Sequence, residues 1–333
     1  MPESAGSVRY GQPLAPRPIA SAEVLAASTP IGMRLGLAAL QHILEAHSAW
    51  LDGRLDGQRA TLSGMVLGET NLDKVNLERA DLKSANLIDA RMYGANLSGA
   101  ILQFANLRNA TLTGADLSHA DLTDADLKFA LLAGANLSGS RLLRTSLRNA
   151  NLRQVQMLEA SIDGCDFTAA IMREARLLQT KVFDCTFADV ELEGANLYHC
   201  AFRCCRLPGI HAAGSKWGTA ILQNCEFRRA DLTSASFERA DLRHSSFWKA
   251  TLTGSSLQTV RMNGTDMEGA DLTGVRFHDA TTMSANFSGA NLRGAQGLTQ
   301  TQLAQARTDR HTILPDGSSG PFLLGSGAHR PCR

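Results

Sequence analysis

A large apolar residue recurs every five positions over most of the chain, from Leu62 to Leu292. The series has 47 positions, of which 42 hold Leu, Phe or Met, and no insertion interrupts it. Small residues form a second series two positions earlier, as at Ala80 and Ala85, and Asn or Asp often stands between the two series. The repeating unit is therefore A-(N/D)-L-x-x.

Neither regular element accommodates a period of five. Five residues advance an α-helix by about 500°, so successive leucines would spiral around its axis. On a flat strand the side chains alternate, so every second leucine would face solvent. The pattern fits a chain that turns a corner once per unit, with the small and the large residue both facing inward. Stacking such turns would bury both series and pair their backbones, which predicts an all-β solenoid.

The A-(N/D)-L-x-x units over residues 60–296 resemble the pentapeptide-repeat family. The resemblance implies a right-handed, quadrilateral parallel β-helix with four units per coil, and hence about 12 coils. Residues 20 positions apart would then stack in columns. Some members of the family protect type II DNA topoisomerases, such as DNA gyrase, by imitating duplex DNA.

Each end of a solenoid exposes unpaired backbone and apolar surface, so both ends need caps. Residues 32–59 are expected to form a helical N-terminal cap, because leucines recur there at helical spacing. These leucines are Leu37, Leu40, Leu44 and Leu51. The preceding segment, residues 1–31, is expected to be a tail.

Residues 297–317 are expected to form the C-terminal cap. The stretch 297–306 reads as a short helix, for which Thr299 is a suitable N-cap. The segment that follows, residues 318–333, is rich in Gly, Pro and Ser and is expected to be a flexible tail.

The charge is nearly balanced, with 33 Lys and Arg against 32 Asp and Glu in 333 residues. This balance argues against broad electrostatic binding to nucleic acid or to an acidic membrane surface. The longest apolar stretch, around residues 35–44, is too short to span a bilayer. The N-terminus lacks the pattern of a signal peptide, so we expect a cytoplasmic bacterial protein.

No motif for catalysis is present, and the Asp residues mostly occupy the A-(N/D)-L position, where a structural hydrogen bond at a corner is expected. The cluster His199, Cys200, Cys204 and Cys205 suggests zinc. However, the repeat places Cys200 and Cys205 inside and the other two outside, so they would not converge on one ion. We therefore expect no enzyme activity, metal or cofactor.

Four cysteines fall in one inward column: Cys165, Cys185, Cys205 and Cys225. A redox or metal stripe is one interpretation. The alternative is that cysteine serves here as a small buried residue. Stacked Cβ atoms would lie about 4.8 Å apart, farther than the 3.8 Å typical of a disulfide, which favours free thiols.

Outward columns supply the candidate binding residues. Leu158, Leu178 and Tyr198 should point out on one face, with Leu143 and Phe183 on the adjoining side. An exposed apolar stripe on a rigid rod is a candidate protein contact site. The alternatives are burial under a terminal tail or within a homodimer.

A second column, Arg108, Lys128 and Arg148, forms a short basic stripe. Stacked like charges repel one another, which suggests an acidic partner. The alternative is an ordinary solvated surface.

One unit departs from the pattern. Pro208 is expected to remove a backbone donor and to cause a local bulge or kink, with the register of the repeat kept. Ala212 replaces a large inward residue, and Trp217 could fill the space that it leaves.

These features predict a non-enzymatic scaffold or adaptor that presents side-chain columns to a protein partner whose identity the sequence does not give. The alternative function is a gyrase-binding mimic of DNA. That function needs a strongly negative surface, whereas residues 60–295 contain 25 acidic and 24 basic residues. The uninterrupted repeat also lacks the projecting loops of the quinolone-resistance members.

Overall fold

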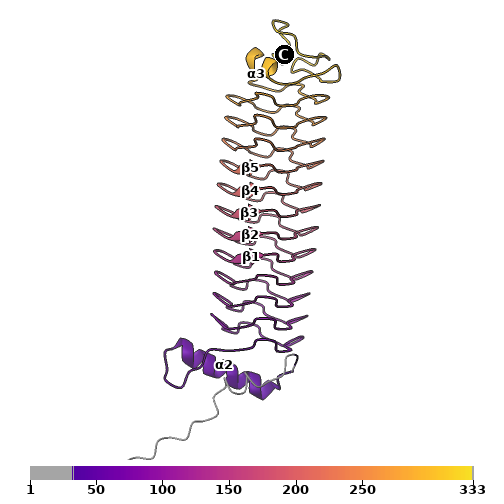
Figure 1. The fold of residues 1–333 in the computed structure, drawn as a ribbon. Coiled ribbons are helices and arrows are strands. Elements are labelled where there is room, and N and C mark those ends of the chain that lie inside the picture. The colour runs from indigo at the N-terminus through magenta and orange to yellow at the C-terminus, as the bar shows by residue number, and fades with distance from the viewer. Residues whose placement is uncertain (1–31, 33, 332–333) are drawn as a thin grey trace, which may run out of the picture.

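The computed structural model describes residues 32 and 34–331, which form a rod of stacked coils with a helix at each end (Figure 1). The expected tail over 1–31 lies outside the described residues. Parallel backbone bridges join positions 20 apart along the rod, from Thr61 with Asp81 to Asp271 with Asn291. Each coil therefore contains four units, which confirms the predicted parallel β-solenoid.

The corner of a typical unit is a four-residue turn that starts at the large apolar residue. The amide of Ala105, for example, donates to the carbonyl oxygen of Leu102 (N–O 3.1 Å). The third residue of this turn, Phe104, has φ of 58°. A positive φ at this position is what a type II turn requires. Many units place Gly there, where it adopts the conformation without a Cβ penalty.

Asn and Asp before the large residue hold these corners in place. The side-chain oxygen of Asp81 accepts from the amide of Lys83 (3.0 Å), and that of Asn136 accepts from the amide of Ser138 (3.0 Å). This is the geometry of an Asx turn. The prediction that these residues serve as structural hydrogen-bonding groups is confirmed.

Both inward series are buried, and three stacked leucines, Leu102, Leu122 and Leu142, have no exposed surface. The interior also accommodates exceptions to the pattern. Trp217 is fully buried, and its ring lies 5.9 Å from that of Phe237 in a stacked arrangement. Aromatic contacts therefore fill the core in the coil where Ala212 replaces a large residue.

One side of the rod is flat enough to form regular strands. Five strands pair in chain order and in parallel, with a register of 20 residues. They are β1 (Arg141–Leu143), β2 (Ser161–Asp163), β3 (Lys181–Phe183), β4 (Ala201–Arg203) and β5 (Ile221–Gln223).

The cysteine column lies directly behind the corners that follow these strands. There a side chain of the next coil replaces the amide as donor to the corner carbonyl. The Cys165 thiol donates to Leu142 O (3.3 Å), and the Cys225 thiol donates to Phe202 O (3.4 Å). These corners follow the five three-residue strands. All six cysteines in the described part of the chain are free, and the column makes thiol-to-carbonyl bonds instead of disulfides.

The predicted bulge at Pro208 is wrong. The flanking amides keep their bonds to the next coil, with Leu207 N 2.7 Å from Glu226 O and Gly209 N 2.9 Å from Arg228 O. Pro208 occupies the second position of the turn, whose amide serves the Asx bond and not the backbone ladder. Proline is favoured at this position, and Gly209 follows it with φ of 65°.

The N-terminal helix α2 (Leu37–Leu51) lies across the first coil (Figure 1). Leu40 and His47 are buried, whereas Leu37, which belongs to the predicted apolar spacing, is 79% exposed. His47 Nδ1 accepts from the amide of Ala60 (3.1 Å), where the repeat begins. This bond joins the helix to the first coil.

The C-terminal helix α3 (Gln300–Gln305) has Thr299 as its N-cap in a reciprocal capping box, which confirms that prediction. Thr282 replaces a large inward residue, and its hydroxyl donates to Gln302 O (2.7 Å). Thr282, which departs from the repeat pattern, thus joins α3 to the last coil through this hydrogen bond.

The chain beyond 317 does not leave the rod at once. Gly320 N donates to Thr312 O (3.0 Å), and Phe322 N donates to the Thr308 hydroxyl (2.9 Å). Backbone bonds to the cap therefore continue past the boundary expected at residue 317.

Candidate contact surfaces

The five apolar residues predicted for protein contact lie along the two edges of the strand side. Leu143 and Phe183 end β1 and β3, and Leu158, Leu178 and Tyr198 occupy the corner that precedes the strands. Phe183 is 51% exposed and Leu158 is 42% exposed, while the other three are half-buried. We call these five residues the contact face.

The centre of the contact face is polar. Arg141 and Lys181 are the outward residues of β1 and β3, and both are exposed. The apolar residues thus form two margins, and exposed side chains of both charges lie among them, since Glu159 and Asp163 accompany the two cations and Asp163 separates Leu143 from Phe183. The arrangement differs from the single stripe that the sequence suggested.

Tyr198 leans along the rod over the next coil. A Cβ on Gly218 would lie 2.1 Å from Tyr198 Cε1, so only glycine leaves room for the ring. The position of Tyr198 is therefore set by a residue on the neighbouring coil.

The predicted basic stripe carries its own counter-charges. Lys128 Nζ lies 3.3 Å and Arg108 Nη1 3.7 Å from Asp126 Oδ2, and Arg148 Nη1 lies 2.9 Å from Asp166 Oδ2. Burial raises the pKa of Asp166, but bonds from Thr168 and from Arg148 outweigh it and hold this pKa below the usual value. The stripe is consequently an ion-paired surface.

The His199–Cys205 cluster does not converge. Cys200 and Cys205 lie in the interior, whereas Cys204 and His199 are exposed. Burial raises the pKa of the Cys200 thiol and keeps it protonated. His199 Nδ1 instead lies 2.7 Å from the Thr219 hydroxyl. In residues 34–331 no group of three or more His, Cys, Asp or Glu side chains is arranged to hold a metal ion.

A second cationic group lies on the same corner as the basic stripe and was missed from the sequence. Trp248 has three cations around its ring: Lys249 Nζ at 4.4 Å, Arg228 Cζ at 5.1 Å and Arg229 Cζ at 5.5 Å from the centroid. We call these four residues the tryptophan cluster. The column of Arg228 and Trp248 lies beside the column of Arg229 and Lys249. Examining these two columns together would have predicted the tryptophan cluster from the sequence.

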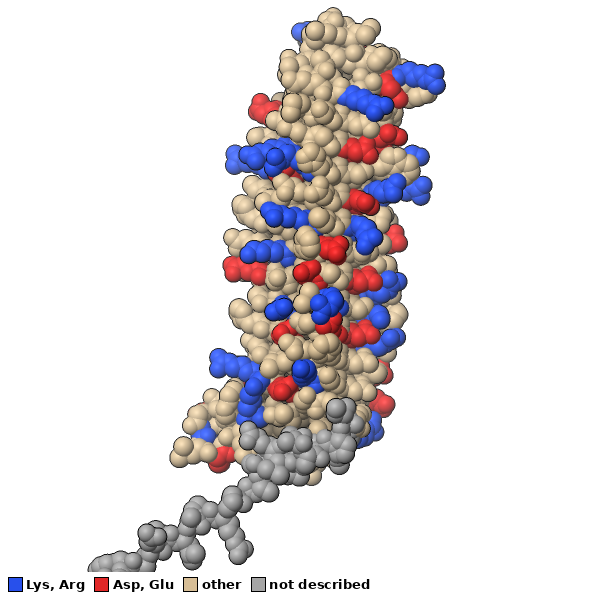
Figure 2. All heavy atoms as spheres, viewed as in Figure 1, with Lys and Arg blue, Asp and Glu red and all other residues tan. Residues whose placement is uncertain are grey.

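Figure 2 shows Lys and Arg interspersed with Asp and Glu over the face of the rod in view. Neither helix in the described part of the chain has the length and apolar character needed to cross a bilayer.

Family models cover most of the repeat. One described as "Pentapeptide repeats (8 copies)" matches residues 60–99, 90–128 and 130–168, and one described as "Pentapeptide repeat region" matches residues 180–255 and 230–307. No curated protein matches the chain.

Several solved structures are similar to this chain. A pentapeptide repeat protein from the Arabidopsis thaliana thylakoid lumen is 29% identical, with 29% of this chain and 68% of that chain covered and a TM-score of 0.29. HetL, which is involved in heterocyst differentiation regulation in the cyanobacterium Nostoc, is 25% identical. The match covers 86% of this chain and 99% of HetL, with a TM-score of 0.25. The plasmid-mediated fluoroquinolone resistance protein QnrB1 is 18% identical. The match covers 65% of this chain and 92% of QnrB1, with a TM-score of 0.20. Because the family models match more than half of its residues, this chain belongs to the pentapeptide-repeat family.

Proposed function

We propose that this protein is a non-catalytic scaffold that binds a protein partner through the contact face. The observation that carries the proposal is the stacking of outward apolar side chains, one exposed and two half-buried, in successive coils beside the strand side of the rod. Leu158, Leu178 and Tyr198 occupy the same corner position 20 residues apart. Other exposed apolar residues, such as Phe129 and Leu131, do not recur in the coils above and below.

The surface favours a partner of particular chemistry. Burying a large apolar side chain contributes about 1.5–3 kcal/mol, so the two margins can supply the affinity. Arg141 and Lys181 favour carboxylates across the interface, whereas the exposed Glu159 and Asp163 favour cations there. The partner is therefore expected to present apolar residues with charges of both signs between them.

A homodimer through this face is the alternative to a different partner protein. In a two-fold interface the same patch occurs on both sides and must be self-complementary. Arg141 and Lys181 of one copy would have to face carboxylates such as Glu159 and Asp163 of the other. Size-exclusion chromatography with light scattering tests this point, because dimer formation lost on substitution of Leu158 would support self-association instead.

Topoisomerase protection is the second function considered, and the surface charge opposes it. Residues 60–295 carry 25 acidic and 24 basic residues, whereas a mimic of duplex DNA needs a continuous negative surface. A supercoiling assay with gyrase, quinolone and titrated protein distinguishes the two functions. Protection at stoichiometric amounts would favour the topoisomerase function over the scaffold.

Substitution of the contact face tests the scaffold. The variant carries Leu158→Ser, Leu178→Ser and Tyr198→Ser, and the matched control carries Tyr93→Ser, Phe129→Ser and Leu131→Ser, which are partly exposed residues on other parts of the rod. Partners are captured on each immobilised protein from a lysate of the native host and quantified by mass spectrometry. We expect a partner that the wild type and the control retain and the contact-face variant loses. Equal recovery on all three proteins would remove the contact face from the binding mechanism.

A further inference from the structure

The tryptophan cluster differs from every other group of cations on its corner because it lacks a counter-ion. The basic stripe, four coils earlier on this corner, is balanced by Asp126 and Asp166. Within the described residues, no carboxylate lies within 4.0 Å of the charged groups of Arg228, Arg229 or Lys249. Three like charges around one ring repel each other, and an external anion would relieve that repulsion.

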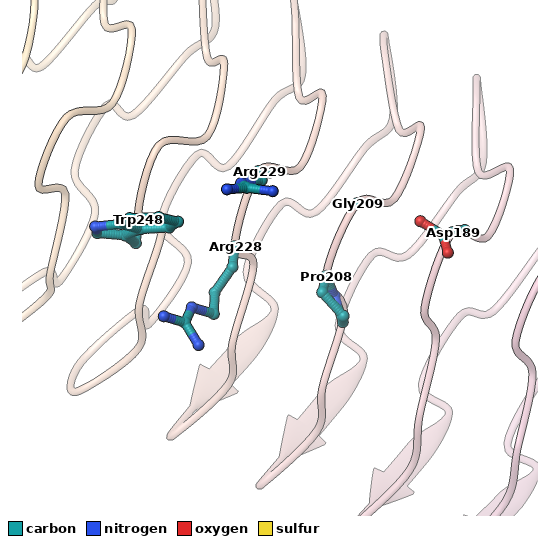
Figure 3. Close-up of a pocket in the computed structure, with 6 residues that line it drawn as sticks. All are labelled: Asp189, Pro208, Gly209, Arg228, Arg229 and Trp248. Atoms are coloured by element: carbon teal, nitrogen blue, oxygen red, sulfur yellow. The ribbon is translucent and has the colours of Figure 1, made fainter.

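Two of these cations, Arg228 and Arg229, border a groove of about 480 Å³ (Figure 3). Trp248, Arg228 and Arg229 line one end, Asp189 lies at the other, and Pro208 and Gly209 lie between them. The hollow exists because the Pro-Gly turn carries little side chain. A Cβ on Gly209 would lie 2.5 Å from Asp189 Oδ1, so glycine is also needed to seat that carboxylate.

We propose that this groove binds an acidic peptide segment of a partner protein. Carboxylates of the segment face Arg228 and Arg229, whose guanidinium groups suit bidentate pairing. An apolar side chain of the segment packs on Trp248 and Pro208. The proposal goes beyond the contact face and stands independently of it, because the two surfaces occupy different corners of the rod.

A peptide fits this site better than a nucleic acid. Along the same two corner columns the cationic group is bounded by Asp189 on one side and by Glu268 on the other. A polynucleotide carries regularly spaced phosphates and would bring them against these carboxylates.

The test measures fluorescence anisotropy of a fluorescein-labelled peptide of sequence DDLDDL titrated with the full-length protein. The test variant carries Arg228→Glu and Arg229→Glu. The matched control carries Arg108→Glu and Arg148→Glu, which changes the net charge equally on the same corner. We expect saturable binding by the wild type, about tenfold or greater loss in the test variant and less than about twofold loss in the control.

Two further measurements complete the design. Trp248→Ala should weaken peptide binding, and the contact-face variant should bind the peptide as the wild type does, so failure of one surface is distinguishable from failure of the other. Absence of saturable binding by the wild type, or equal loss in the test and control variants, would overturn the proposal. Tighter binding of a labelled six-nucleotide oligo(dT) than of the peptide would also overturn it, in favour of a nucleic-acid site.

Discussion

The Cys165 thiol donates to the carbonyl oxygen of Leu142, which lies 23 residues earlier in the chain and 3.3 Å away. One coil earlier, Leu122 O accepts both the turn bond from Ala125 N (3.0 Å) and a bond from the Thr145 hydroxyl (2.8 Å), so a donor from the next coil is compatible with a closed corner. At the cysteine column the flat side is extended, and β1 and β2 pair there. The interior cysteine column thus lies directly behind the strands that the contact face borders.

The cysteine column can be tested by comparing two substitutions at Cys225. Serine keeps a donor for Phe202 O, as Ser245 does in the next coil toward Leu222 O, whereas alanine removes it. A buried acceptor left without a donor costs about 1–3 kcal/mol, so Cys225→Ala should be less stable than Cys225→Ser by about 1 kcal/mol. Equilibrium unfolding in urea under reducing conditions measures the difference. An alanine variant as stable as the serine variant would mean that the corner recloses without the side chain.

Acid is expected to loosen the N-terminal cap. Burial lowers the pKa of His47, whose Nδ1 must stay unprotonated to accept from the Ala60 amide. In the unfolded chain the same imidazole takes up a proton near its ordinary pKa of about 6.5. The unfolded state therefore binds more protons below that pH, and the stabilisation present above about pH 6.5 is lost as the pH falls toward the lowered pKa.

The fluorescence of Trp50, which stacks on His47 with ring centroids 5.5 Å apart, reports this loosening. We expect a transition below pH 6.5 in the wild type. In His47→Asn, whose side-chain oxygen can take the place of Nδ1 without titrating, the transition should disappear. An unchanged pH profile in this variant would assign the effect to other groups.

The glycine beneath Tyr198 offers a way to move that ring without removing it. In Gly218→Ala the new Cβ would clash with Cε1, so the ring must swing away from the rod. We expect partner binding to fall while the urea midpoint changes little, because the atoms nearest to the new Cβ all belong to the Tyr198 side chain at the rim of the rod. The double variant Gly218→Ala with Tyr198→Ala should bind no worse than Tyr198→Ala alone. A further loss in the double variant would show that Gly218 acts through the backbone and not through the ring.

The Pro-Gly corner should stabilise the rod. Proline at a compatible turn position restricts the unfolded chain, so Pro208→Ala should cost about 0.4–1 kcal/mol. Gly209→Ala should cost more, about 1–2 kcal/mol, because its φ of 65° disfavours a Cβ. Thermal unfolding of both variants checks the order. A Pro208→Ala variant with a higher melting temperature than the wild type would show instead that Pro208 disturbs the coil, as the sequence suggested.

The five-residue period was enough to predict a solenoid with two inward series, whereas the four units per coil that stack Leu102, Leu122 and Leu142 came from the resemblance to the pentapeptide-repeat family. The position of Asn and Asp before the large residue predicted their hydrogen bonds at the corners. The short helix expected after the repeat predicted Thr299 as its N-cap. The error at Pro208 arose because the sequence does not reveal which amide of the unit joins the backbone ladder. That knowledge needs the turn geometry, in which the second turn position points its amide elsewhere.

The surfaces were less predictable than the core. Columns show which side chains stack, but not how long side chains reach across columns. The pairing of Arg148 with Asp166 joins a corner to the adjacent side, and Trp248 collects cations from two neighbouring columns. Both depend on side-chain direction, which the repeat leaves free at outward positions.

The 20-residue register also fixes the distance and the angle between the two proposed surfaces. A whole coil inserted between Tyr198 and Arg228 would move the two surfaces apart by about 4.8 Å and leave their relative bearing unchanged. A single five-residue unit inserted there would instead rotate everything beyond it by a quarter turn. The distance between the two proposed surfaces can therefore change only in steps of one coil if both surfaces are to keep their directions. Only insertions of four units at a time satisfy this condition.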